Sequence, residues 1–168
     1  MTIILFSLLF LTVFFVTRSH RYLERYYDTV LYISLISVVY GLICIDFAMW
    51  HFPVWWIFTD HASLLFQAVV LFPSTTVVFL RYFPRSRGLI APYFLLFVIA
   101  YVVMEWMMLK LGQIRYAHGW SLGWSTLVVV LMFLMMWLHE KSKKLTWVFT
   151  FIVITWLVTW FDVPLLAL

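Results

Sequence analysis

The sequence predicts an all-α integral membrane protein, built as a single bundle of six transmembrane helices with both termini on the outer side (N-out/C-out). Long apolar runs fill most of the 168 residues, and the basic residues collect after every second run. Hydrophobic residues make up 66% of the chain and charged residues 11%, with a mean hydropathy of +1.05. Soluble domains are about 45–50% apolar and about 25% charged. This composition therefore excludes an ordinary soluble fold.

Six apolar runs come close to the length of about 20 residues that a helix needs to cross a bilayer. They cover residues 2–17, 29–50, 61–80, 89–111, 120–138 and 145–161. The first run has no basic segment before it and no small-residue cleavage site after it, so it is predicted to stay as a span. Folded domains start at roughly 50 residues, and no connection is that long. We therefore expect one transmembrane domain over residues 1–168.

Local features refine two of the predicted spans. Pro73 falls near the middle of the third span, where it predicts a kink because proline lacks the amide proton of the helix ladder. Ser34, Ser37 and Gly41 share one face of the second span. Small side chains at this spacing let helices approach closely, and packing within the bundle is favoured over dimerisation.

Three short loops hold nine of the eleven Lys and Arg residues. Cytoplasmic loops retain such residues whereas translocated loops lack them, so these loops are predicted to be cytoplasmic. The net charge of +4 does not indicate nucleic acid, because membrane topology and anionic headgroups account for it. The densest basic loop, with Arg81, Arg85 and Arg87, is expected to contact the lipid bilayer or dock a membrane-protein partner. A second copy of the chain, in a homo-oligomer, is a further alternative for the partner.

Two acidic residues fall inside predicted spans, near their outer ends. A carboxylate at the centre of a membrane helix costs about 2.5–3.5 kcal/mol on insertion scales, and less near the interface. Such groups usually face the bundle interior and find a partner there. Asp46 and Glu105 are therefore candidate functional residues. Pairing with Lys110 or Arg115 in a structural network is the alternative interpretation.

Aromatic residues are plentiful, with ten Trp and nine Tyr. An interfacial belt explains most Trp positions. The alternative hypothesis is that some of them, Trp156 included, form an aromatic wall around a ligand. Indole faces attract cations. The predicted ligand- or ion-binding residues are Asp46, Glu105, Gln67, Trp106, Trp120 and Trp124.

A metal site is a further hypothesis, with Asp60, His61, His51 and His118 as candidate ligands on the outer side. No familiar spacing of metal ligands occurs. No hydrolase or phosphate-binding motif is present either, so we predict no catalytic residue, name no cofactor and do not expect an enzyme. Cys44, the single cysteine, is expected to be buried and structural.

These observations favour a binding or permeation subunit for a small polar or cationic solute, with its site in the outer half. The alternative is a non-catalytic structural or assembly protein that docks partners through its basic loops. The two hypotheses differ in what they require of the acidic residues, since only a solute site needs the carboxylate itself.

A family resemblance adds to this prediction. It rests on Phe72-Pro73-Ser74, Arg81-Tyr82-Phe83-Pro84, Glu105, Tyr116 and Gly119-Trp120-Ser121-x-x-Trp124. In the second half of the chain, this pattern resembles a family of small, uncharacterised multi-pass membrane proteins found mostly in spore-forming Gram-positive bacteria. The resemblance implies a bacterial cytoplasmic or spore membrane and gives weight to Glu105 and Trp120.

Overall fold

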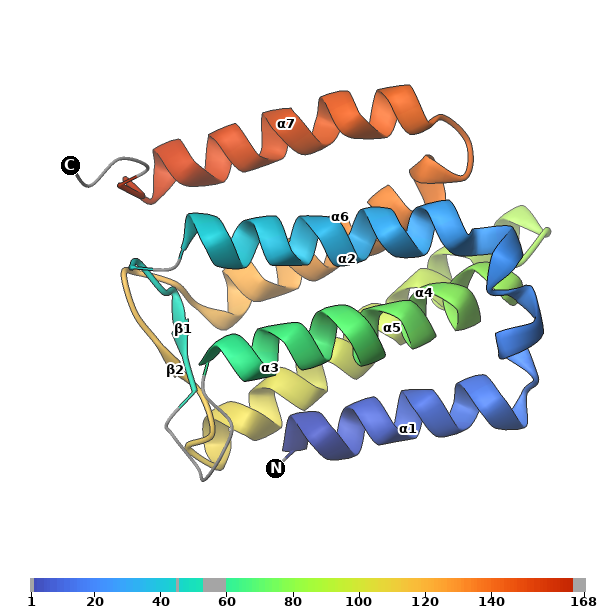
Figure 1. Cartoon of the computed structure of the whole chain (residues 1–168), viewed down its shortest axis with the longest axis horizontal. Helices are drawn as coiled ribbons and strands as arrows, with labels where there is room; N and C mark the ends of the chain where they lie inside the picture. Colours follow the sequence, from blue (N-terminus) through green and yellow to red (C-terminus); the bar gives the residue numbers. More distant parts are fainter. Residues whose placement is uncertain (1, 45, 53–59, 165–168) are drawn as a thin grey trace.

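The computed structural model describes residues 2–44, 46–52 and 60–164, with the backbone alone for Asp60 and His61. It is all-α apart from one small two-stranded ladder (Figure 1). The elements in chain order are α1 (Thr2–Val16), η1 (Ser19–Tyr22), η2 (Glu24–Tyr26), α2 (Tyr27–Ile43), β1 (Trp50–His51), α3 (Asp60–Phe66), η3 (Gln67–Leu71), α4 (Phe72–Arg81), α5 (Arg87–Lys110), β2 (Arg115–Tyr116), α6 (Leu122–His139) and α7 (Lys143–Trp160).

Four helical segments are long and apolar enough to cross a membrane. They are Glu24–Ile43, Ala62–Arg81, Arg87–Lys110 and Leu122–His139. The remaining two are α1, an apolar helix of 15 residues, and α7, which begins with two lysines. Large apolar side chains also cover the outside of the bundle, as Leu96 on α5 and Phe151 on α7 illustrate. An apolar exterior of this kind suits a lipid environment.

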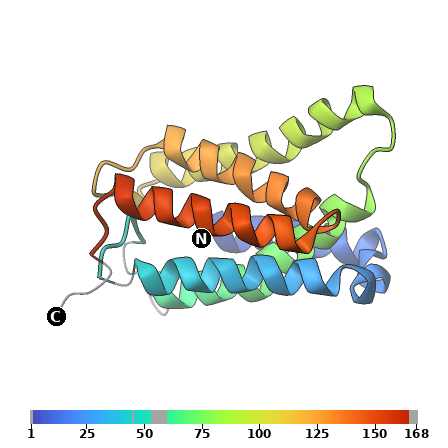
Figure 2. The ribbon, with the colours of Figure 1, turned by 90° about the horizontal axis from the view of Figure 1, so that it is seen from above.

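The bundle has two chemically different ends (Figures 1 and 2). The three basic connections, which follow α1, α4 and α6, lie together at one end, which we call the basic end. The first and last described residues and the β1–β2 ladder lie at the opposite end, which we call the terminal end. The ladder is antiparallel and pairs Trp50 with Tyr116. The sequence predicted this segregation of the basic loops.

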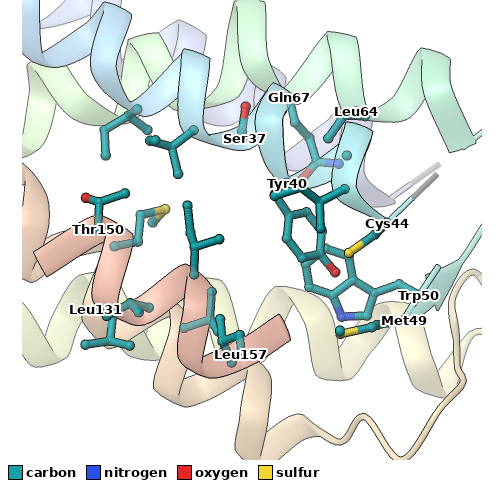
Figure 3. Close-up of a pocket in the computed structure, with 18 of the residues that line it drawn as sticks. Ser37, Tyr40, Cys44, Met49, Trp50, Leu64, Gln67, Leu131, Thr150 and Leu157 are labelled. Carbon is teal, nitrogen blue, oxygen red and sulfur yellow. The ribbon is translucent and has the colours of Figure 1, made fainter. Parts of the chain in front are cut away.

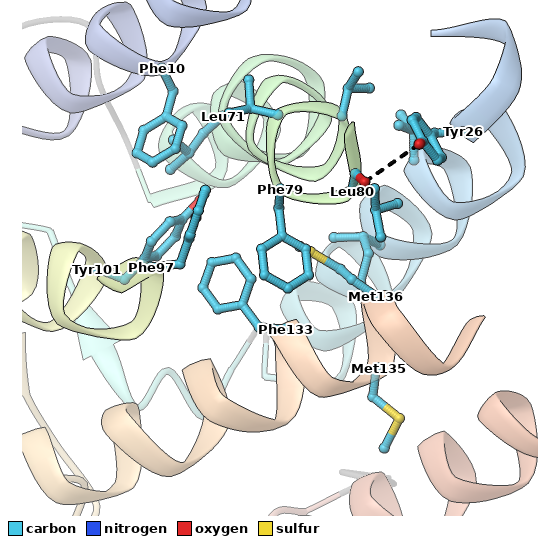
Figure 4. Close-up of a cluster of buried hydrophobic side chains, with 14 of the residues drawn as sticks. Phe10, Tyr26, Leu71, Phe79, Leu80, Phe97, Tyr101, Phe133, Met135 and Met136 are labelled. Atoms are coloured by element: carbon cyan, nitrogen blue, oxygen red, sulfur yellow. Dashed lines mark hydrogen bonds between the residues drawn. The ribbon is translucent and has the colours of Figure 1, made fainter. Parts of the chain in front are cut away.

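The core is built around α4, which packs against α1, α2 and α6. Phe79 on α4 is completely buried and meets Phe133 on α6, with ring centroids 4.9 Å apart (Figure 4). Phe97 and Tyr101 on α5 extend this aromatic cluster. Buried aromatic pairs contribute about 0.5–1.5 kcal/mol beyond their area, so this cluster fixes how the central helices meet.

A widened helical turn lies where the sequence predicted a kink at Pro73. The turn before it, η3, is a π-helix of five residues. Proline cannot donate to the helix ladder and its ring crowds the preceding turn, which a wider turn relieves. The irregularity lies beside the cavities described below, because Gln67 is its first residue.

The predicted close approach of α2 also occurs. The Ser34 hydroxyl donates to the Ala68 carbonyl at 2.7 Å, which ties α2 to η3. A Cβ atom added to Gly41 would lie 2.0 Å from the Leu64 side chain. A larger residue would force the Leu64 side chain to shift, so the small face of α2 serves packing within the bundle.

The second predicted span is too long by about two turns. It was expected to cover 29–50, but α2 ends at Ile43 and Trp50 lies in β1. Asp46 is consequently exposed in a bend beyond the helix, not buried within it. An exposed position avoids the desolvation that a carboxylate suffers in hydrocarbon. The other five predicted spans agree with the helical segments to within two residues.

Candidate functional site

Glu105 lies on α5, one and a half turns before the helix ends at Lys110 at the terminal end. Its Oε1 atom accepts a 2.8 Å hydrogen bond from the Tyr116 hydroxyl in β2. The Ser125 hydroxyl, on α6, donates to the same oxygen. The carboxyl group of Glu105 is thus held by one strand and one neighbouring helix.

A second layer of contacts fixes the two donors. The Trp120 indole donates a 2.8 Å hydrogen bond to the Ser125 oxygen, which leaves the Ser125 proton for Glu105. Tyr116 is positioned by its pairing with Trp50 across the ladder. Burial and the adjacent Glu105 raise the pKa of Tyr116. The Tyr116 hydroxyl therefore keeps its proton and remains a donor to this carboxyl.

Glu105 and Ser125 line a cavity of about 130 Å³ between α1, α5 and α6. Its other walls are mainly apolar and include Ile3, Met104 and Met108. Gln67 from η3 also lines this space, and its amide nitrogen donates a 3.3 Å hydrogen bond to the Ser63 carbonyl. The cavity thus combines apolar walls with a carboxyl group and an amide.

A larger cavity of about 300 Å³ adjoins it, between α2, α6 and α7 (Figure 3). The two cavities share Trp50, Gln67 and Met132, among other residues. The larger one is lined mostly by aliphatic side chains, with Leu131 and Leu157 facing Tyr40 across it. Ligand pockets in proteins are about 300–1,000 Å³, mostly apolar with a few placed polar groups, and this description fits the pair.

Two polar atoms beside the larger cavity have no hydrogen-bond partner within the described part of the chain. They are the Tyr40 hydroxyl and the Trp50 indole nitrogen, both buried. The Cys44 thiol lies close enough to the Tyr40 hydroxyl to interact with it weakly (Figure 3), since thiols are poor hydrogen-bond acceptors. Burial raises the pKa of Cys44, so its thiol stays neutral. The expectation that Cys44 is buried is confirmed.

The structure brings together three of the six predicted ligand-binding residues. Glu105, Gln67 and Trp120 line the cavities. Trp120 is only 5% exposed, and its ring lies 5.5 Å from that of Trp50. These contacts make the terminal end of the bundle the candidate site.

The other three predicted residues lie elsewhere. Asp46 is exposed beyond α2, and Trp106 points outward with 48% of its surface exposed. Trp124 packs against Trp156 and Trp160 rather than lining either cavity. Periodicity could not separate the inward and outward faces here, because the helices are apolar on every side.

Sequence reasoning missed several residues that complete the site, namely Tyr40, Trp50, Tyr116 and Ser125. Tyr116 appeared only within the family resemblance. Its role depends on the β1–β2 ladder, which joins segments more than sixty residues apart. Ser125 lies one turn into α6. A hydroxyl group in an otherwise apolar helix is the sequence feature that could have marked it.

The ion-pair network is not present among the described residues. No Lys or Arg lies within ion-pair distance of Glu105 there, and Lys110 instead lies 5.9 Å from the Trp106 ring centroid. The described ion pair joins Asp28 and Lys143 at the basic end. Within the described ranges, Glu105 has hydroxyl partners only.

The described residues contain no group of three potential metal ligands, so they do not support the metal hypothesis. His118 stacks on Phe47, and His51 is exposed in β1. The side chains of Asp60 and His61 lie outside the described part, so their role stays a prediction.

The basic loop divides into two kinds of arginine. Arg81 is half-buried and donates to the Thr17 carbonyl and the Ser19 hydroxyl. Its guanidinium also lies 4.4 Å from the Tyr22 ring centroid. Arg85 and Arg87 are exposed. Arg81 thus has an internal role, and the other two remain available to lipid or a partner.

Comparisons with known proteins were made at three levels. No model of a protein family matches the chain, and neither a curated protein nor a solved structure does. The fold and the site define an all-α protein with four helical segments long and apolar enough to cross a membrane and a cavity at its terminal end. The family resemblance stays a prediction.

Proposed function

We propose that this chain is a polytopic membrane protein that binds a small solute through a cationic or hydrogen-bond-donating group beside Glu105. The observation that supports it most is the Glu105 carboxyl group, which lines a cavity and has no cationic partner within the described residues. A donor on the solute would complete the hydrogen bonding of this group. Binding alone, or binding as a step of permeation, is consistent with such a site.

The walls of the smaller cavity indicate the chemistry of the rest of the solute. Gln67 adds an amide to the lining of the same cavity, and Trp50 adds an aromatic ring that can attract a cation. The remaining lining is largely apolar, so the solute needs an apolar body next to its polar group. A short alkylamine has this chemistry.

We infer that all six helical segments cross the bilayer, with both termini and the Glu105 site on the outer side. The shared position of the three basic connections supports this orientation, because basic loops are retained in the cytoplasm. The family resemblance points to a bacterial cytoplasmic or spore membrane. Under this topology the site opens near the outer surface.

The test is hexylamine binding to the full chain in lipid nanodiscs, measured by titration calorimetry against empty nanodiscs. Hexanol serves as the neutral probe with the same alkyl chain. We expect hexylamine to bind the wild-type chain and Glu105→Gln to weaken that binding about tenfold or more, since hydrogen bonds to charged groups contribute about 1.5–3 kcal/mol.

The matched control is Glu24→Gln, which removes an exposed acid at the basic end. It should leave hexylamine binding unchanged. Equal hexylamine affinity in the wild type and in Glu105→Gln would contradict the proposal.

A structural or assembly role through the basic loop is the second candidate, and the exposure of Arg85 and Arg87 supports it. It predicts that Arg85→Gln with Arg87→Gln reduces co-purification of a membrane partner, whereas Glu105→Gln does not. The reverse pattern, with hexylamine binding lost only in Glu105→Gln, favours the solute site.

A further inference from the structure

The larger cavity has the form of a groove along α2 and α7. Its long walls include Ile36 on α2 and Ile154 and Leu157 on α7, all of them half-buried rather than sealed. The outer surfaces of both helices carry exposed apolar residues, such as Leu35 and Ile152. In a membrane, the open side of this groove would therefore face lipid chains.

Both ends of the groove are closed by side-chain contacts. Toward the basic end, the Tyr32 hydroxyl is hydrogen-bonded to the Thr150 hydroxyl. Toward the terminal end, Cys44, Met49 and Trp120 form part of a separate buried cluster. A bound molecule would lie lengthwise between these two closures, parallel to the helices.

Polar groups without a strong partner occur at the terminal end of the groove. The rings of Tyr40 and Trp50 are 5.2 Å apart. The buried Trp50 N–H has no hydrogen-bond partner within the described residues, and the buried Tyr40 hydroxyl has none there apart from the weakly accepting Cys44 thiol. An indole nitrogen can only donate, whereas a phenol can donate or accept. A carbonyl oxygen has two lone pairs and can accept from both groups.

We propose that the groove binds one alkyl chain headed by a carbonyl or carboxyl oxygen, taken from the surrounding membrane. The head accepts hydrogen bonds from Tyr40 and Trp50, and the chain lies along the aliphatic walls toward Tyr32. A single chain fits the volume of about 300 Å³, which is twice that of a cavity of about 150 Å³ known to hold benzene. This inference goes beyond the proposed solute site and does not depend on it.

The test is native mass spectrometry of the full chain released from nanodiscs of dioleoyl phosphatidylcholine. Methyl decanoate and protonated decylamine at neutral pH are the probes, because they share a chain length while the ester head accepts hydrogen bonds and the ammonium head only donates them. We expect methyl decanoate to form a one-to-one adduct at about fivefold lower concentration than decylamine, since one or two hydrogen bonds separate them. Tyr40→Phe combined with Trp50→Phe should remove this preference.

Two further variants are matched controls. Tyr27→Phe changes an exposed tyrosine at the basic end, and Trp156→Phe changes an indole outside the groove lining. Both should keep the preference for methyl decanoate. The single variant Tyr40→Phe should reduce it, and this arm remains informative if the double variant does not fold.

Three results would overturn the inference. They are the absence of any adduct, equal binding of both probes regardless of the variants, and a retained diacyl lipid that excludes methyl decanoate. Glu105→Gln keeps a side-chain oxygen that can accept from Tyr116, so Trp50 should stay in place and methyl decanoate binding should remain intact. Failure of the hexylamine site and failure of this groove are therefore separate outcomes.

Discussion

Tyr116 donates a 2.8 Å hydrogen bond to Glu105 and thereby joins the strand ladder to the longest helix of the bundle. Because β1 pairs with β2, the same contact also fixes Trp50 at the cavity wall. The ladder is short, but it determines where two of the cavity-lining groups lie. The stability of the terminal end should therefore depend on the Glu105 contacts.

Removing either donor to Glu105 should destabilise the protein. We expect Tyr116→Phe or Ser125→Ala to lower the free energy of unfolding by about 1–3 kcal/mol. Each variant leaves the half-buried Glu105 carboxyl short of a donor, and Ser125→Ala also removes the acceptor of the Trp120 indole. The two donors share one oxygen atom, so the double variant should be non-additive. Chemical unfolding in micelles measures this, with Thr126→Ala as a control whose hydroxyl contacts its own helix. Additive losses would contradict the shared contact.

Tyr40 and Tyr32 should respond in opposite ways to loss of the hydroxyl. In the described part of the chain the Tyr40 hydroxyl has no partner apart from the weakly accepting Cys44 thiol, whereas the Tyr32 hydroxyl bonds to Thr150. Tyr40→Phe should raise the stability of the ligand-free protein by about 1 kcal/mol, and Tyr32→Phe should lower it by a similar amount. Thermal unfolding of the pair checks this. Destabilisation by Tyr40→Phe would show that the hydroxyl has a structural partner.

Arg81 should be the structural member of the basic loop. Arg81→Ala removes its contacts with Thr17, Ser19 and Tyr22, and we expect a loss of about 1–3 kcal/mol in the free energy of unfolding. Exposed Arg85 provides the comparison, and Arg85→Ala should stay within about 0.5 kcal/mol of the wild type. Equal losses in the two variants would refute this division.

The orientation can be tested by cysteine labelling in a Cys44→Ser background. Asp46 and Ser86 are both exposed, at the terminal and the basic end respectively. A membrane-impermeant maleimide added to intact cells should label Asp46→Cys and not Ser86→Cys. Labelling of Ser86→Cys from outside would reverse the predicted topology.

The sequence predicted the helices well because apolar length is a property of each segment alone. Five of the six predicted spans coincide with helical segments to within two residues. The second span was overextended since the apolar run continues through Asp46 to Trp50, although the helix ends at Ile43. Beyond Ile43 the chain pairs as β1 with the distant strand β2 instead of continuing the helix. The hydrophobic pattern of one segment does not reveal a pairing with a distant strand.

The site was predictable only in part. Glu105 and Gln67 are polar residues in apolar helices, which is a strong local signal. The Trp residues gave no such signal, because Trp120 and Trp106 both lie near the outer ends of predicted spans while one is buried and the other exposed. Which of them faces the cavity depends on how neighbouring helices pack, and that follows from the whole bundle.

The most direct measurement of the central claim is a crystal structure of the full chain grown with a bromine-labelled hexylamine. Anomalous scattering would locate the bromine independently of the protein density. The proposed function predicts an anomalous peak within the smaller cavity and an amine nitrogen within hydrogen-bonding distance of the Glu105 carboxyl group. A cavity without ligand density, or a peak found only on the lipid-facing surface, would contradict the assignment of Glu105 as a solute-binding residue.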